Sequence, residues 1–106
     1  MLKQAHICFI EGIGRYRSIH LTLEGSEVHQ MSTIISDTTL DDFESQLSND
    51  VFLRLHRSYI ANLNQIMGLV MESRKHLVSL RDIAIKIPVS RSKVNNLKMI
   101  LSGVSK

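Results

Sequence analysis

The sequence contains one cysteine, one proline and no tryptophan, and it has no long uninterrupted apolar run. A single cysteine, Cys8, excludes an intramolecular disulfide, and alone it cannot form a metal cluster. The longest apolar runs are short, such as residues 7–10, whereas a membrane-spanning helix needs about 20 residues. The N-terminal residues also lack the basic start, apolar stretch and cleavage site of a signal peptide. We therefore expect a cytoplasmic protein with no membrane span.

The length of 106 residues is that of one compact domain and leaves little room for an enzyme cleft with a second lobe. No repeat, linker or low-complexity segment divides the chain, so we expect a single domain over residues 1–106. The hydrophobic fraction of 43% and the charged fraction of 22% are ordinary for a globular protein and do not indicate disorder.

The charged residues are distributed unevenly. Residues 1–50 carry three basic and eight acidic side chains, whereas residues 51–106 carry ten basic and two acidic ones. A basic half favours a polyanionic partner such as nucleic acid. The alternative is a solvated surface whose charges balance across the fold.

Short strand-like segments dominate the chain. Gly12 and Gly14 mark a turn after the first of them, and residues 24–26 predict a hairpin turn between the second and the third. The pattern predicts a mostly-β domain. The expected strands are residues 5–11, 16–23, 27–35, 51–55, 59–60, 66–72, 76–80 and 83–87.

Two segments have the period of an amphipathic helix. In the first, Thr39 can cap the helix and Asp42 can complete a capping box. In the second, Ser90 can cap a short C-terminal helix. The expected apolar faces consist of Leu40, Phe43 and Leu47 in the first helix and of Val94, Leu97 and Leu101 in the second.

Three stretches carry a family resemblance when they are taken together. They are residues 10–16 (IEGIGRY), residues 52–62 (FLRLHRSYIAN, followed by Ile66) and residues 87–91 (IPVSR). In order and spacing they resemble the signature segments of the LytTR family of DNA-binding domains. The resemblance extends over nearly the whole chain, and the helix expected after Thr39 lies where that family places one.

The resemblance implies both a fold and a function. The fold would be layered short-strand sheets of LytTR type, with one short mid-chain helix and a short C-terminal helix. The function would be sequence-specific binding of double-stranded DNA at direct repeats, through loops placed in the major groove, to regulate bacterial transcription. Direct repeats imply a second copy of the domain on DNA. Many such domains are outputs of two-component response regulators, so a receiver domain or a partner regulator is a further expected partner.

The resemblance also names candidate contacts to DNA. Arginine can donate two hydrogen bonds to guanine in the major groove, serine and asparagine can bond bases or phosphates, and lysine can neutralise phosphate. The candidate DNA-binding residues are Arg15, Arg17, His56, Arg57, Ser58, Asn62, Ser90, Arg91 and Lys93.

Several residues have structural alternatives. His56 can be a half-buried histidine that hydrogen-bonds to the backbone, and Asn62 can be a turn residue that bonds its own backbone. For others a role in the fold is the main alternative: Arg54 as the exposed face of a strand, Arg74 and Lys75 as a solvated turn, Ser58 as a structural residue and Tyr59 as a core residue.

The sequence gives little indication of hydrolysis, metal binding or nucleotide binding. Ser58 and His56 lack a partnered acid and the elbow motif of a hydrolase, so we expect no enzyme. His20 and His29 could face each other across the expected hairpin, but no third metal ligand is evident. The glycines of residues 12–14 lack the third glycine of a nucleotide-binding loop, so no cofactor is expected.

Two further classes of function remain as competitors. One is a LytTR-like protein-interaction or regulatory module that no longer reads DNA, which would be expected to lose the basic loop residues. The other is a small RNA binder, but two tyrosines, three phenylalanines and no tryptophan provide few rings for base stacking.

Overall fold

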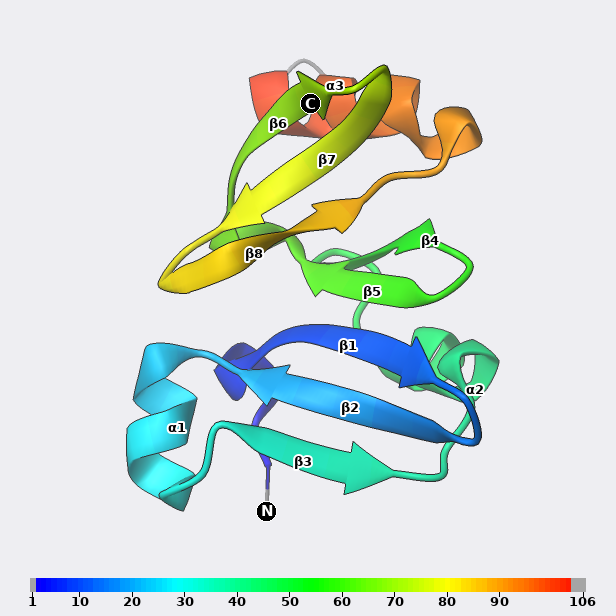
Figure 1. Ribbon diagram of the computed structural model, residues 1–106. Helices are drawn as coiled ribbons and strands as arrows, with labels where there is room; N and C mark the ends of the chain where they lie inside the picture. Colours follow the sequence, from blue (N-terminus) through cyan, green and yellow to red (C-terminus); the bar gives the residue numbers. More distant parts are fainter. Residues whose placement is uncertain (1, 104–106) are drawn as a thin grey trace.

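The computed structural model describes residues 2–103, which form two antiparallel sheets and three α-helices (Figure 1). The first sheet has the strand order β3-β2-β1-β5-β4 and the second has the order β6-β7-β8. The prediction of a mostly-β fold is confirmed. The strands are β1 (Ile7–Ile13), β2 (Tyr16–Leu21), β3 (Thr33–Ser36), β4 (Phe52–His56), β5 (Tyr59–Asn62), β6 (Ile66–Glu72), β7 (Lys75–Leu80) and β8 (Ile83–Pro88).

Two apolar clusters form the core on either side of the first sheet. Strand β1 is buried over residues 7–10 because both of its faces are covered, which explains its continuous apolar run. Phe9 belongs to the cluster shared with the second sheet and with α3 (Val94–Ser102), whereas Ile10 belongs to the cluster that includes Leu40 of α2 (Leu40–Gln46).

Helix α2 begins as the sequence predicts. Thr39 is the N-cap, and its Oγ1 accepts a hydrogen bond from the backbone nitrogen of Asp42 at 3.1 Å. Leu40 is buried and Phe43 is half-buried against the core, so the expected apolar face is confirmed at these positions. The helix ends early, because Leu47 already has the extended backbone of a C-cap.

The predicted hairpin turn at residues 24–26 and the return strand over residues 27–35 are wrong. The chain instead forms α1 (Leu23–His29), and β3 begins only at Thr33. Thr22 caps α1 by accepting a hydrogen bond from the backbone nitrogen of Gly25 at 3.0 Å. A Cβ atom on Gly25 would lie 2.7 Å from the Cβ atom of His6. This glycine therefore serves close packing, not a turn.

The C-terminal helix differs from the prediction at its start. Ser90 precedes a 3-10 turn, η3 (Arg91–Lys93), and its side chain makes no capping hydrogen bond. Val94 and Leu97 are buried as expected, whereas Leu101 is exposed. None of the helices within residues 2–103 has the length and apolar character needed to cross a membrane.

Candidate nucleic-acid interface

The β1–β2 turn and the β4–β5 turn lie at the same end of the first sheet (Figure 1). Strand β1 pairs with β5 so that Glu11 faces Tyr59, and the backbone nitrogen of Gly12 donates to the carbonyl of Ser58 at 2.8 Å. This bond joins the two turns. The candidate residues at 15–17 and at 56–58, far apart in the sequence, are therefore neighbours.

The segment that follows β8 connects the two sheets beside the β4–β5 turn. The backbone nitrogen of Ser90 donates to the carbonyl of Leu55 at 2.7 Å, and that of Val89 donates to the carbonyl of His76 at 2.9 Å. A shallow groove forms between these elements. Its polar and charged lining, which we call the basic groove, consists of His56, Arg74, Lys75, His76, Ser90 and Arg91.

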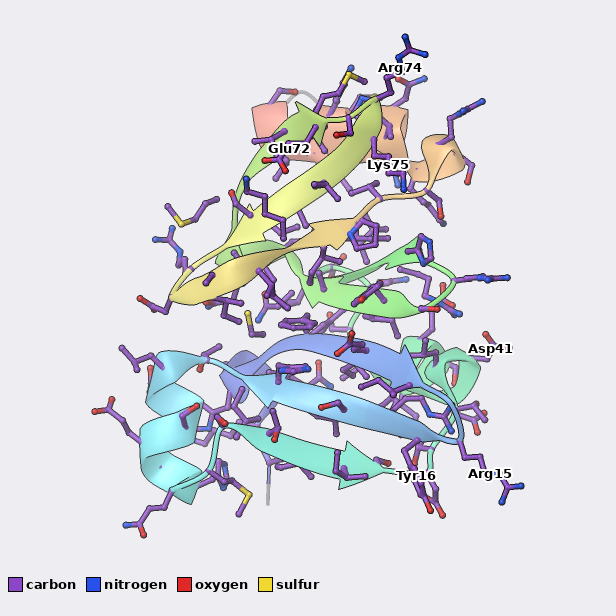
Figure 2. All side chains as sticks on the ribbon, in the orientation of Figure 1. Arg15, Tyr16, Asp41, Glu72, Arg74 and Lys75 are labelled. Atoms are coloured by element: carbon purple, nitrogen blue, oxygen red, sulfur yellow. The ribbon has the colours of Figure 1, made fainter. Side chains whose placement is uncertain are left out.

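The basic groove combines predicted DNA-binding residues with residues that the sequence favoured as a solvated turn. The prediction placed His56, Ser90 and Arg91 in one site, and the structure brings them together. It adds Arg74 and Lys75 from the β6–β7 turn, which the sequence favoured as a solvated turn. Arg74 extends from the upper edge of the molecule in Figure 2, and Lys75 lies below it. The only sequence signal for them was the basic character of the turn.

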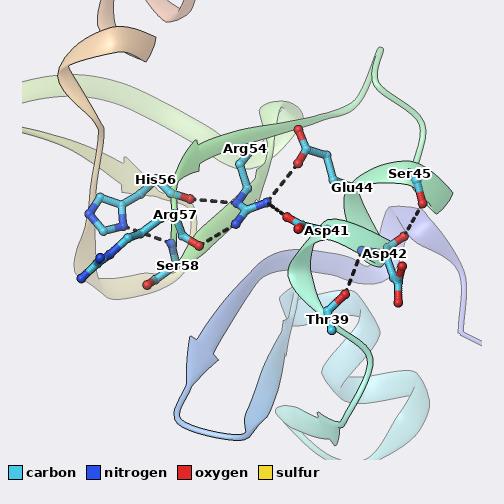
Figure 3. A network of polar contacts seen from close by, with 9 residues as sticks. All are labelled: Thr39, Asp41, Asp42, Glu44, Ser45, Arg54, His56, Arg57 and Ser58. Atoms are coloured by element: carbon cyan, nitrogen blue, oxygen red, sulfur yellow. Dashed lines mark hydrogen bonds and ion pairs between the residues drawn. The ribbon is translucent and has the colours of Figure 1, made fainter.

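Arg54 bonds the backbone of the β4–β5 turn (Figure 3). Its Nε donates to the carbonyl of His56 at 3.0 Å, and one Nη donates to the carbonyl of Arg57 at 2.6 Å. The other Nη contacts carboxylate oxygens of Asp41 and Glu44, each at 3.0 Å. The side chain of Arg54 is only 17% exposed. The alternative that Arg54 is simply the exposed face of a strand is therefore wrong.

His56 is the half-buried, backbone-bonded histidine that the sequence analysis considered. It is half-buried, and its Nδ1 accepts a hydrogen bond from the backbone nitrogen of Ser58 at 3.1 Å. The same ring lines the basic groove. A backbone bond at one ring nitrogen leaves the other ring nitrogen for a ligand.

Among the candidate arginines, Arg91 lines the basic groove and Arg57 directly follows His56, which lines it too. Both are exposed, and within residues 2–103 neither guanidinium has a hydrogen-bond partner. Lys93 is half-buried in the 3-10 turn that follows Ser90. Arginines without an internal partner can bond an external acceptor and break no contact of the fold.

Two candidate arginines lie at the β1–β2 turn. Within residues 2–103 the guanidinium of Arg15 has no hydrogen-bond partner, whereas that of Arg17 bonds the backbone. Arg15 is exposed and extends away from the molecule at the lower right of Figure 2. Arg17 is half-buried, and its guanidinium donates to the carbonyls of Arg15 at 2.8 Å and Asp37 at 3.4 Å. Arg17 thus stabilises the turn from which Arg15 projects.

Asn62 lies inside the molecule. It is 1% exposed, its Nδ2 donates to the carbonyl of Ile7 at 2.9 Å, and its Oδ1 accepts from the backbone nitrogen of Asn64 at 2.9 Å. The turn role considered for Asn62 is confirmed. With its side chain buried and bonded, Asn62 is left out of the interface that we propose below.

Tyr59 packs beside the core and carries a polar contact. Its hydroxyl donates to Glu11 at 2.9 Å, and the other oxygen of Glu11 lies 3.2 Å from Nε2 of His20. Burial, together with the hydrogen bond and the negative charge of Glu11, raises the pKa of Tyr59. Tyr59 is therefore held as a neutral structural residue next to the turn.

The histidines considered as a metal pair do not face each other across a hairpin. His20 of β2 stacks on Phe9 of β1, with ring centroids 4.1 Å apart, whereas His29 lies in α1 against His6. Within the described part of the chain, no group of three or more His, Cys, Asp or Glu side chains could hold a metal ion.

The chain is similar to known proteins in sequence and in fold. The profile of the LytTr DNA-binding domain matches residues 1–102. The heme-containing CO-sensing transcriptional regulator RcoM 1 of Paraburkholderia xenovorans is 30% identical over 105 residues, which are 98% of this chain and 36% of that protein. The transcriptional regulatory protein YpdB of Escherichia coli is 33% identical over 63 residues, or 58% of this chain and 26% of that protein.

A solved structure supports the fold. A LytTr DNA-binding domain from Bacillus cereus superposes with a TM-score of 0.73 at 24% identity, over 91% of this chain and 81% of that one. By the sequence matches above, this chain covers only about a third of the length of RcoM 1 and about a quarter of the length of YpdB. Because the family profile covers nearly all of the chain, this protein belongs to the LytTr DNA-binding domain family.

Proposed function

We propose that this chain acts as one sequence-specific domain that binds double-stranded DNA at direct repeats and regulates bacterial transcription in the cytoplasm. The observation that carries the proposal is the joining of the β4–β5 turn, the β6–β7 turn and the segment at Ser90 and Arg91 around the basic groove. Such a set of basic loops at one edge fits a groove of duplex DNA, whose phosphates flank the base edges.

Arg57 and Arg91 are proposed to read bases. Each presents a planar fork of donors that matches O6 and N7 of guanine in the major groove. Both are exposed and unpaired within residues 2–103, so their donors are available for bases. His56 lies between them in the proposal, with its outer ring nitrogen directed to the DNA.

The remaining residues of the edge are proposed to position the domain on the backbone of the duplex. Lysine, arginine and serine side chains commonly bond the phosphate oxygens of DNA. These contacts contribute affinity and orient the protein, but they carry no sequence information. Arg15, at the β1–β2 turn, adds a basic side chain beside the β4–β5 turn. Arg17 acts in the β1–β2 turn mainly by stabilising it. The proposed phosphate contacts are Arg15, Ser58, Arg74, Lys75, Ser90 and Lys93.

Direct repeats would place two copies of the domain on one DNA molecule in the same orientation. The full-length relatives RcoM 1 and YpdB are transcriptional regulators, and this chain matches only a part of each. We therefore propose that it serves as a DNA-binding output, controlled by a receiver domain or by a partner regulator. The runner-up is a regulatory module that no longer binds DNA. The basic loop arginines argue against it, because Arg57 and Arg91 are exposed and have no partner in the described part of the chain.

The test is selection of bound duplexes from a random pool with the purified chain. We expect enrichment of a motif that occurs twice in the same orientation, and the selected sequences would also give the repeat spacing. Enrichment of a single motif would contradict the direct-repeat part of the proposal. A pool that stays random after several rounds would favour the module that does not read DNA.

A further inference from the structure

Every backbone carbonyl of residues 56–58 has a hydrogen-bond partner inside the molecule. Arg54 bonds the carbonyls of His56 and Arg57, and the backbone nitrogen of Gly12 bonds that of Ser58. The backbone nitrogen of Ser58 in turn donates to Nδ1 of His56. The turn that carries Arg57 is therefore held by side chains of β4 and by the backbone of β1, and not by regular ladder bonds alone.

Strand β4 is irregular at this point. Arg54 pairs with Ile60, but His56 pairs with Tyr59, so Leu55 is an extra residue in the ladder. A bulge of this kind bends a strand and redirects the side chains that follow it. The backbone after Arg54 thus depends on added contacts for its course, and Arg54 supplies two of them.

Helix α2 fixes the guanidinium from the other side. The remaining Nη of Arg54 contacts Asp41 and Glu44, whose side chains are 89% and 51% exposed (Figure 3). Exposed ion pairs contribute little to the free energy of unfolding. Their effect here is geometric, because they hold the plane of the guanidinium while its other nitrogens bond the turn.

We infer that Arg54 is a positioning residue, which sets the conformation of the β4–β5 turn so that Arg57 and His56 can discriminate between DNA sequences. The inference rests on the proposed DNA-reading function of that turn. Base recognition needs side chains held to within about 0.5 Å by the residues behind them. Lysine cannot replace Arg54 in this role, because its single ammonium nitrogen cannot span two carbonyls and two carboxylates.

The inference separates the affinity for any duplex from the discrimination between DNA sequences. A simple loss of charge would lower both together. Arg54→Lys keeps the positive charge, so contacts to phosphate and the affinity for any duplex should persist. Discrimination should fall because the turn loses its two guanidinium bonds. A merely structural role would lower the melting temperature and leave the discrimination of the folded protein unchanged.

The experiment measures dissociation constants by fluorescence anisotropy for two duplexes. One is the duplex most enriched by the wild-type chain, and the other has the same length and composition in scrambled order. For Arg54→Lys we expect the ratio of the two constants to fall by about tenfold, the scale of one lost base contact. The matched control is Arg81→Lys, an exposed arginine at the β7–β8 turn, which should keep the wild-type ratio.

A second variant keeps the test decisive if Arg54→Lys does not fold, as judged by circular dichroism. The double substitution Asp41→Asn with Glu44→Gln changes only exposed side chains. It should lower the ratio below the wild-type value, by less than tenfold. Wild-type ratios in the folded variants would overturn the inference. A wild-type chain that binds both duplexes equally would overturn the proposed function, and the inference with it.

Discussion

The Nδ1 atom of His56 lies 3.1 Å from the backbone nitrogen of Ser58 and accepts its hydrogen bond. A ring nitrogen that accepts carries no proton, so the neutral ring has its proton on Nε2. The ring also lines the basic groove. The β4–β5 turn thus fixes the tautomer of His56 and makes Nε2 a donor for an acceptor on DNA.

Replacement of His56 by asparagine and by glutamine should separate the two ring nitrogens. Asparagine can keep the acceptor for Ser58 but has no donor at the position of Nε2, whereas glutamine can reach that position. We expect His56→Asn to weaken binding of the selected duplex by about 1 kcal/mol, the scale of one hydrogen bond, and His56→Gln to weaken it less. Anisotropy titrations would show this order, and full affinity in His56→Asn would contradict it.

Arg57→Ala and Arg91→Ala should each reduce specific binding by about 1–3 kcal/mol, the usual value of a base contact. Neither side chain has a partner within residues 2–103, so the free energy of unfolding should stay close to that of the wild type. Gel-shift titrations on the selected duplex measure the effect, with Arg81→Ala as the control. If both variants bind like the wild type, these arginines do not read bases.

Lys93→Ala should weaken binding to all duplexes by a similar factor. A lysine that neutralises one phosphate contributes about one unit to the slope of log K against log salt. Titrations on the selected and scrambled duplexes at several salt concentrations would give both slopes. An unchanged slope would remove Lys93 from the proposed phosphate contacts.

The single cysteine should make folding stability depend on pH in alkaline solution. Burial raises the pKa of the Cys8 thiol from its ordinary value of 9.0 to about 12, with a smaller effect of Asp82. The unfolded chain therefore loses this proton first, so the contribution is full below pH 9 and declines as pH rises toward 12. Urea unfolding at pH 8 and 10 should show a larger loss for the wild type than for Cys8→Ala, and equal losses would contradict the prediction.

Gly25→Ala should destabilise the fold by about 1–3 kcal/mol, the usual penalty of overpacking. The new Cβ atom would lie 2.7 Å from both the Cβ atom and the carbonyl oxygen of His6, so α1 would have to move. Gly68→Ala is the matched control, because its nearest atom would be Oγ of Ser79 at 3.9 Å. Urea unfolding of both variants measures the difference, and equal stabilities would show that α1 adapts freely.

Local signals in the sequence predicted much of the fold correctly. The Thr39 cap and the apolar face of α2 depend on residues three or four positions apart, so the sequence alone shows them. The short strands followed from alternation and from turn residues. The failure at α1 came from Gly25, because a glycine marks a turn and a close packing contact equally well in a sequence.

The candidate site was predictable only in part. Arg57 and Arg91 stand out in the segments that resemble the family, and both are exposed at the edge. Asn62 belongs to the same segment but is buried, because its amide bonds Ile7, which is 55 residues away in the sequence. Arg54 also lies in that segment, but nothing local showed its role, since its partners Asp41 and Glu44 belong to helix α2 and not to its own strand.

By itself, the sequence determined the mostly-β class, the capped helix α2 and the family, because these depend on near neighbours and on ordered motifs. The tertiary structure decided which candidate residues face outward and which loops meet. The bonds of Ser90 to Leu55 and of Gly12 to Ser58 join segments more than thirty residues apart, as their numbers in the chain show. Such contacts form only when the whole chain packs, so no local pattern could have revealed the basic groove.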